Sequence, residues 1–177
     1  MVVALIKNLA LPSRLGKTLL IGTLSLYFLI IAFNNIVDYE TNFKFVEHVL
    51  SMDSIGADAH VQWRAIRSTQ LHHVAYWTII LWELATGCIS GLGAMRMFFA
   101  LRFKDKFETA KTLSIAALWL GLLLWALGFI TVGGEWFLMW ESSVWNGEAS
   151  ALRMFILNAF ALLFLYLPDA EKESSAR

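Results

Sequence analysis

One acidic side chain lies inside a long apolar stretch of this chain. Glu83 falls within residues 74–101, whose other members are almost all apolar or small. That stretch is long enough to cross a bilayer, which takes about 20 mostly apolar residues. An ionisable group at that depth costs about 3 kcal/mol if it faces lipid, so we expect Glu83 to face a neighbouring helix, a polar cavity or a partner.

Two histidines, His72 and His73, stand at the entrance of the same stretch. His72 and Glu83 are close to three helical turns apart, so they share a face at a separation of about 16 Å. This pattern fits a polar track that runs inward from the surface. It fits equally well an interfacial histidine and, deeper, a carboxylate that is hydrogen-bonded to another helix. The candidate partners of that carboxylate are Asn34, Asn35, Asp38 and Asn158.

The sequence contains no familiar catalytic or cofactor motif. It has no Gly-x-Ser-x-Gly, Walker or His-Glu-x-x-His pattern, and no Glu-x-x-His of a di-iron site. All histidines precede the core of the second apolar stretch, which argues against haem held between facing helices. We therefore predict no catalytic residue, no metal ligand and no cofactor. A surface metal site stays open as an alternative, built from nearby acids and from His48, His60, His72 and His73.

Composition indicates a membrane protein. Hydrophobic residues make up 58% of the chain and charged residues only 16%, against about 45–50% and about 25% in soluble domains. The formal net charge of zero gives no basic field for nucleic acid. The single cysteine, Cys88, excludes an intrachain disulfide.

The apolar stretches predict an all-α membrane protein, a bundle of four transmembrane helices in one domain that spans residues 1–177. The predicted spans are residues 18–37, 74–101, 112–132 and 151–167. Most lysines and arginines lie in the first tail, in the loop 102–111 and in the last tail. The positive-inside rule then predicts cytoplasmic termini in a plasma (inner) membrane, with outer loops at 38–73 and 133–150.

Three local patterns refine this prediction. Gly87 and Gly91 lie on the Glu83 face in a small-xxx-small pattern, so we expect them to let another helix pack closely. An apolar stripe predicts a short helix over residues 42–52 of the first outer loop, lying on the membrane or capping the bundle. Pro12 predicts a break in any helix through the first tail.

The first outer loop also carries a distinctive set of blocks. They read Phe-Asn-Asn-x-x-Asp-Tyr at residues 33–39 and Val-x-His-Val-Leu-Ser-Met-Asp at residues 46–53, followed by Trp-Arg-Ala-Ile at residues 63–66. With these blocks the chain resembles a bacterial family of predicted small integral membrane proteins with a domain of unknown function, from Arg14 to Leu167. The resemblance implies a four-helix inner-membrane protein and implies no activity.

The polar residues of these blocks are expected on the outer side of the membrane. Asn34, Asn35, Asp38, His48 and Arg64 are the candidate polar or binding residues there. Their charges can neutralise one another, which predicts a folded cap. In that cap Arg64 could clamp a carboxylate such as Asp38 or Asp53 through two hydrogen bonds.

Three functions fit the sequence. The first is a non-catalytic accessory or assembly subunit of a larger membrane complex, with other membrane subunits or a second copy as its partner. The second is a small transporter or proton-relay protein that uses Glu83 with His72 or His73. The third is a membrane enzyme that acts at the outer face. A water-filled path that reaches Glu83 would favour the second, and a dry, fully packed Glu83 would favour the first.

Overall fold

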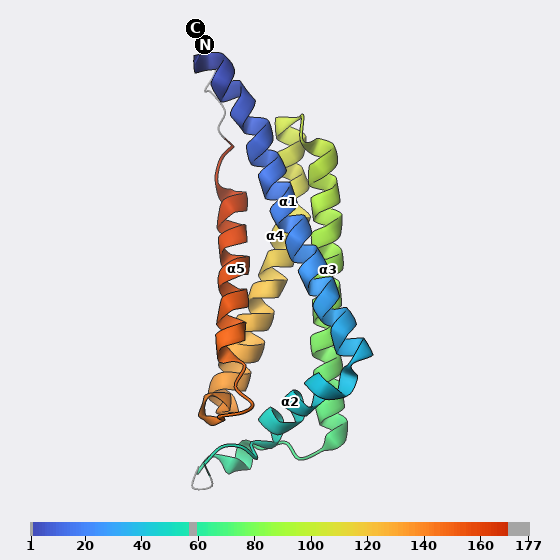
Figure 1. The fold of residues 1–177 in the computed structure, drawn as a ribbon, viewed down its shortest axis with the longest axis vertical. Coiled ribbons are helices and arrows are strands. Elements are labelled where there is room, and N and C mark those ends of the chain that lie inside the picture. The colour runs from blue at the N-terminus through green and yellow to red at the C-terminus, as the bar shows by residue number, and fades with distance from the viewer. Residues whose placement is uncertain (1, 57–59, 170–177) are drawn as a thin grey trace.

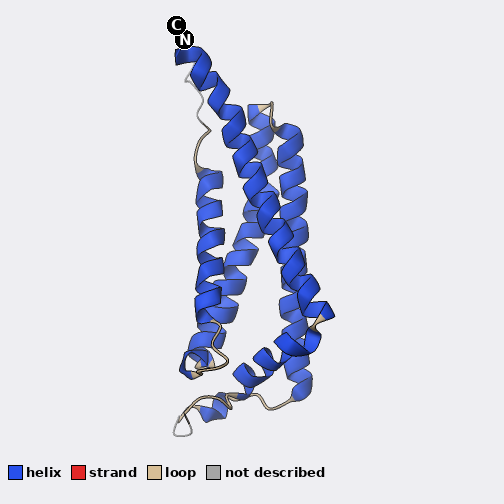
Figure 2. Ribbon diagram, in the orientation of Figure 1, coloured by secondary structure: helices blue, strands red, loops and turns tan. Residues whose placement is uncertain are grey.

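A computed structural model describes residues 2–56 and 60–169, and the side chains from residue 10 onward. All of its regular structure is helical (Figures 1 and 2), which confirms the predicted all-α fold. The elements are α1 (Val2–Val37), α2 (Tyr39–Ser51), η1 (Gln62–Arg64), α3 (Thr69–Ala100), α4 (Lys104–Leu123), η2 (Leu124–Trp136), η3 (Met139–Glu141) and α5 (Glu148–Tyr166).

Four helical segments are long and apolar enough to cross a membrane. They are Ala10–Val37, Thr69–Ala100, Lys104–Trp136 and Glu148–Tyr166, and the third combines α4 with η2. Many of their large apolar side chains are exposed, among them Leu19, Phe99 and Leu163. Such a surface needs lipid around it, because exposing so many apolar side chains to water is unfavourable. The chain is thus an integral, multi-pass membrane protein.

The predicted break at Pro12 is wrong, because α1 continues from Val2 to Val37 with Pro12 inside it. A proline removes one backbone donor and crowds the preceding turn, and these effects bend a helix more readily than they end it. In lipid the remaining backbone groups have no water to bond with, which strongly favours continuing the helix.

Helix α3 packs against both α1 and α4, and it runs along the right-hand side of the bundle in Figure 1. Its glycines mark the closest approaches. A Cβ at Gly87 would lie 2.8 Å from Leu29 Cγ of α1, and one at Gly91 would lie 2.9 Å from Ser25 Oγ. On the opposite side, a Cβ at Gly93 would lie 2.8 Å from the backbone nitrogen of Ser114 in α4. Small residues therefore allow two neighbours to pack against one helix.

The third span changes its winding in its second half, after Leu123. Over η2 (Leu124–Trp136) the backbone is π-helical, with i to i+5 hydrogen bonds such as Phe137 N to Val132 O at 3.0 Å. The helix passes through Gly133 and Gly134, where the sequence suggested a break, and ends at Trp136. A π-helix is wider than an α-helix, and such segments occur frequently at functional sites.

Helix α2 crosses the end of the bundle at which α1 stops and α3 begins (Figure 1). Its residues Phe43, Val46 and Val49 recur at helical spacing and are buried, which gives it one apolar face. Phe43 and Val46 pack with Tyr76 and Ile80 of α3. The predicted outer-loop helix is present, and it covers α3 instead of lying free on the membrane.

The opposite end of the bundle, where α1 begins and α5 ends (Figure 1), holds a cluster of buried charges. Arg14 Nε and Lys17 Nζ lie 2.8 and 2.7 Å from the Asp169 carboxylate. Lys17 and Lys111 also donate to the backbone oxygens of Leu167 and Leu165, at 2.5 and 3.0 Å. The last carbonyls at the end of α5 thus find donors that they would lack in lipid.

Candidate functional site

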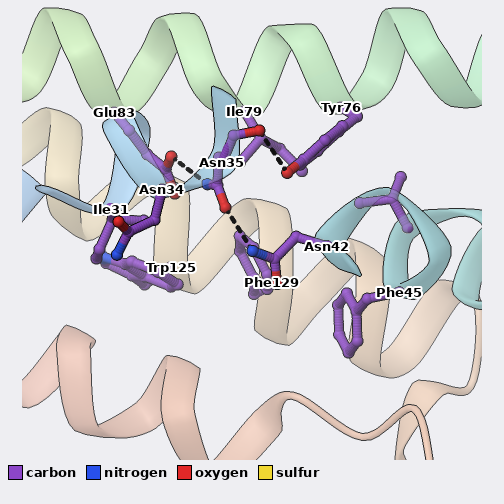
Figure 3. Close-up of a pocket in the computed structure, with 11 residues that line it drawn as sticks. Ile31, Asn34, Asn35, Asn42, Phe45, Tyr76, Ile79, Glu83, Trp125 and Phe129 are labelled. Carbon is purple, nitrogen blue, oxygen red and sulfur yellow. Dashed lines mark hydrogen bonds between the residues drawn. The ribbon is translucent and has the colours of Figure 1, made fainter. Parts of the chain in front are cut away.

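Glu83 lies inside the bundle, with only 2% of its surface exposed. Asn35 Nδ2, from the outer end of α1, donates a 2.8 Å hydrogen bond to Glu83 Oε2. Of the partners proposed for this carboxylate, Asn35 is the one that reaches it, since Asn158 Nδ2 donates to Met154 O within α5. Figure 3 shows the two side chains pointing toward each other.

Asn35 joins three helices in one network. Its Oδ1 accepts a 2.8 Å bond from Asn42 Nδ2 of α2, while its backbone oxygen accepts a 3.1 Å bond from the Tyr76 hydroxyl of α3. Asn35 is itself buried. The side-chain amide of Asn35 therefore donates to Glu83 and accepts from Asn42, and these two bonds hold both side chains in place.

A cavity of about 290 Å³ lies beside this network (Figure 3). It is bounded by α1, α2, α3 and η2. Asn34 and Asn42 are exposed at its edge, whereas Glu83 is buried. The cavity therefore reaches from the surface to the carboxylate. Its lining residues are Ile31, Asn34, Asn35, Asn42, Phe45, Val46, Tyr76, Ile79, Glu83, Trp125 and Phe129.

The polar groups that remain free in this cavity include two acceptors. Glu83 Oε1 and Asn42 Oδ1 have no hydrogen-bond partner within the described part of the chain. A buried carboxylate with one hydrogen bond is far from satisfied, so it needs a proton, further donors or a cation. The aromatic faces of Tyr76, Trp125 and Phe129, which also line the cavity, can favour a cation as well.

The two histidines at the start of α3 do not line this cavity. His72 is buried, and its Nε2 donates a 2.8 Å bond to the Ile66 backbone oxygen. His73 Nδ1 lies 2.8 Å from the Tyr39 hydroxyl, and the ring stacks on Phe43 at 4.1 Å. Burial and the neighbouring carboxylate of Glu40 raise the pKa of Tyr39, so its hydroxyl stays protonated in this contact. No hydrogen bond among the described residues connects either histidine to Glu83.

The other candidates of the first outer loop also lie elsewhere. Asp38 accepts a bond from Thr41 Oγ1 at 2.9 Å and is exposed. His48 pairs with Asp53 at 2.8 Å and stacks on Trp145 at 4.5 Å. In residues 10–56 and 60–169, no group of three His, Cys, Asp or Glu side chains is arranged to hold a metal ion.

Arg64 has different partners from the carboxylates suggested by the sequence. Its Nη1 donates to the Trp136 backbone oxygen at 3.3 Å, and its guanidinium lies 4.6 Å from the Trp136 ring centroid. Neither Asp38 nor Asp53 forms an ion pair with it among the described residues. Arg64 thus connects the first outer loop to the end of η2 through an aromatic ring.

Several cavity residues could not be recognised from the sequence. Asn42 was part of a predicted surface helix, and Trp125 and Phe129 were two of many aromatic residues in an apolar span. Only the position of η2 opposite α2 makes them walls of the same cavity. The available signal was the pair Asn34 and Asn35 at the end of the first predicted span, which were candidate partners of Glu83 from the sequence alone.

Comparison with known proteins agrees with this architecture. No curated protein matches the chain, and no solved structure matches it. A family model described as "Predicted small integral membrane protein (DUF2165)" matches residues 13–168, which include all four apolar helices apart from the first residues of α1. Because that match covers most of the chain and the fold is the one its description implies, the chain belongs to the DUF2165 family of predicted small integral membrane proteins.

Proposed function

We propose that this protein is a small non-enzymatic membrane protein that binds an organic cation at Glu83, as part of transport or proton exchange. The observation that carries the proposal is Glu83 Oε1, which lies at a cavity without a partner among the described residues. Asn42 Oδ1 supplies a second free acceptor in the same cavity. Trp125, which also lines the cavity, has a buried Nε1 donor without a partner among the described residues. None of the residues that line the cavity is a lysine, arginine or histidine, so the free carboxylate oxygen suits a cation from outside.

Proton exchange follows from the chemistry of one buried carboxylate. The negative charge of Glu83 can be neutralised either by a proton or by a bound cation. The two compete, because one carboxylate has a single charge to neutralise. Solute binding would then displace a proton, and proton binding would release the solute. Neither His72 nor His73 is needed for this exchange, since neither lines the cavity.

The test is binding of tetramethylammonium, whose charge does not change with pH, to the purified protein in nanodiscs. We expect saturable binding that weakens as the pH falls and that drops at least about tenfold in Glu83→Gln. Glu135→Gln is the matched control, because Glu135 is exposed in η2 outside the cavity. Equal binding by wild type and Glu83→Gln would reject the proposal. Uptake of the same cation by vesicles would then distinguish transport from binding alone.

An accessory role in a larger inner-membrane complex is the second candidate. Its support is a set of exposed apolar side chains on the outer loops and at the end of η2, namely Trp63, Trp136, Trp140 and Val144. These side chains could contact another subunit or a second copy, as well as the membrane interface. Gentle extraction and mass spectrometry test this role. A stoichiometric partner would support this role. Isolation of a lone chain or a homo-oligomer would argue against a larger complex.

The orientation is part of the proposal too. Both termini are proposed to be cytoplasmic, because most lysines and arginines lie in the two terminal segments and in residues 102–111. Ser143 is exposed in the third loop, so Ser143→Cys in a Cys88→Ser background should react with an impermeant maleimide from outside intact cells. Lys106→Cys, in the first turn of α4, should react only after lysis. The reverse pattern would invert the topology.

A further inference from the structure

A second cavity, of about 300 Å³, adjoins the Glu83 cavity. Four side chains line both of them, namely Phe45, Val46, Ile79 and Phe129. The two cavities are therefore separated only by these shared walls, and together they have the size that small-molecule sites usually occupy.

The chemistry of the two cavities differs sharply. The first contains a carboxylate and three asparagines. The second is lined by apolar side chains and glycines, and Thr78 is its one residue with a polar side chain. The Thr78 hydroxyl is already used, since it donates to Val74 O at 2.8 Å in its own helix. The second cavity thus offers a bound group nothing except apolar contact.

The apolar cavity opens on the side of the bundle, between α3 and η2. Thr78 and Gly128 on its two edges are exposed, and 39% of Val132 is exposed as well. Both edges belong to candidate membrane spans. An apolar chain could therefore enter this cavity from the lipid while a polar head reaches the first cavity.

We infer that the ligand is an amphiphilic organic cation, with an ammonium head at Glu83 and an apolar chain in the adjoining cavity. A carboxylate oxygen without a partner suits an ammonium group, and Tyr76 and Trp125 supply aromatic side chains to the same cavity wall. A neutral or anionic head would leave that carboxylate unpaired or repel it. The aromatic and aliphatic walls of the second cavity suit a single alkyl chain. This inference rests on the proposed function and names its ligand class.

Two probes with the same head separate the head site from the chain site. Decyltrimethylammonium and tetramethylammonium differ only in the chain, and decanol has the same chain without a charge. Each would compete with labelled tetramethylammonium for the protein in nanodiscs, with empty nanodiscs subtracted. We expect decyltrimethylammonium to bind at least about tenfold more tightly than tetramethylammonium, and decanol not to compete.

Gly128→Leu tests the chain site without touching Glu83. A Cβ at Gly128 meets nothing closer than Leu124 Cδ1 at 3.8 Å, so the added side chain fits the backbone and fills the apolar cavity. It should remove the advantage of the decyl chain and retain tetramethylammonium binding. Gly22→Leu on α1 is the matched control, since a Cβ there meets no atom within 4 Å and Gly22 lines neither cavity.

The outcomes separate this inference from the proposed function. Equal binding of the two cations, with no effect of Gly128→Leu, would overturn the inference and leave the Glu83 site standing. Failure of both cations to bind would overturn both. If Gly128→Leu does not fold, Thr78→Leu fills the same cavity from α3, and its result is interpreted in the same way.

Discussion

Asn35 Nδ2 donates to Glu83 Oε2 at 2.8 Å, so the outer end of α1 is hydrogen-bonded to the middle of α3. Both residues are buried. Asn35 Oδ1 also accepts a 2.8 Å hydrogen bond from Asn42 Nδ2 of α2. One amide thus positions the polar wall of the cavity, and its removal should affect both the stability of the bundle and the site.

We predict that Asn35→Ala destabilises the protein by about 1–3 kcal/mol, because it leaves a buried carboxylate without its donor. Asn34→Ala is the control, since Asn34 is exposed and its side chain has no hydrogen bond among the described residues. The measurement is the free energy of unfolding in detergent as denaturant is added. Similar losses in the two variants would show that the Asn35 bond contributes little.

Gly93→Ala should separate α3 from α4. The new Cβ would lie 2.8 Å from Ser114 N and 3.1 Å from Ser114 Cα, and a backbone cannot yield as a flexible side chain does. We expect a loss of about 1–3 kcal/mol in unfolding free energy. Gly16→Ala, where a Cβ meets no atom within 4 Å, should be neutral or slightly stabilising. If both changes are neutral, the close approach of the two helices is not required.

Asp169 should make stability depend on pH at the end that holds the termini. Burial disfavours its charged form, but hydrogen bonds from Lys17 and Arg14 outweigh burial and hold the pKa of Asp169 below its ordinary value of 3.8. The folded state therefore binds this proton less readily than the unfolded state. Its contribution is present above pH 3.8 and is lost as the pH falls through the lower, folded pKa.

Asp169→Asn checks this sign. The variant should be less stable than wild type at neutral pH, and the difference should shrink as the pH is lowered below about 4. Melting temperature measured against pH reports it. Glu108→Gln is the comparison, because Glu108 pairs with Lys111 at 2.7 Å but is about half exposed, so its effect should be small. A difference that grows in acid would contradict the assignment.

Arg64→Ala should loosen the first outer loop. It removes the contact with the Trp136 ring at 4.6 Å and the hydrogen bond to Trp136 O, together about 0.5–1 kcal/mol for an exposed site. Proteinase K should then cleave the loop about two- to fivefold faster, if cleavage follows local opening. Arg67→Ala, at an exposed position, should change the rate little. Arg64→Lys should fall between, because lysine keeps the charge and loses the planar stacking group.

Much of the fold could be predicted from the sequence because lipid imposes simple rules. A span must be long, apolar and helical, so composition and length were enough to predict four membrane helices. The family was predicted from a resemblance in the sequence blocks at residues 33–39, 46–53 and 63–66, and the match confirms it. The helix of the first outer loop was visible in its apolar stripe. Glu83 stood out as a polar side chain at a depth where such groups are costly. Pro12 misled, because a rule learned in water overstates helix breaking in a membrane.

Only the tertiary structure decided which polar groups meet. Asn35 and Glu83 lie 48 positions apart in sequence, and the four proposed partners were equivalent until α1 and α3 were packed together. Helical spacing placed His72 on the face of Glu83. In the structure, however, the His72 side chain is hydrogen-bonded to the Ile66 backbone oxygen and, among the described residues, to no group near Glu83. The π-helical winding of η2 and its position opposite α2 then create the cavities. Spacing along one helix predicts which residues share a face, whereas a site depends on the faces that other helices present to it.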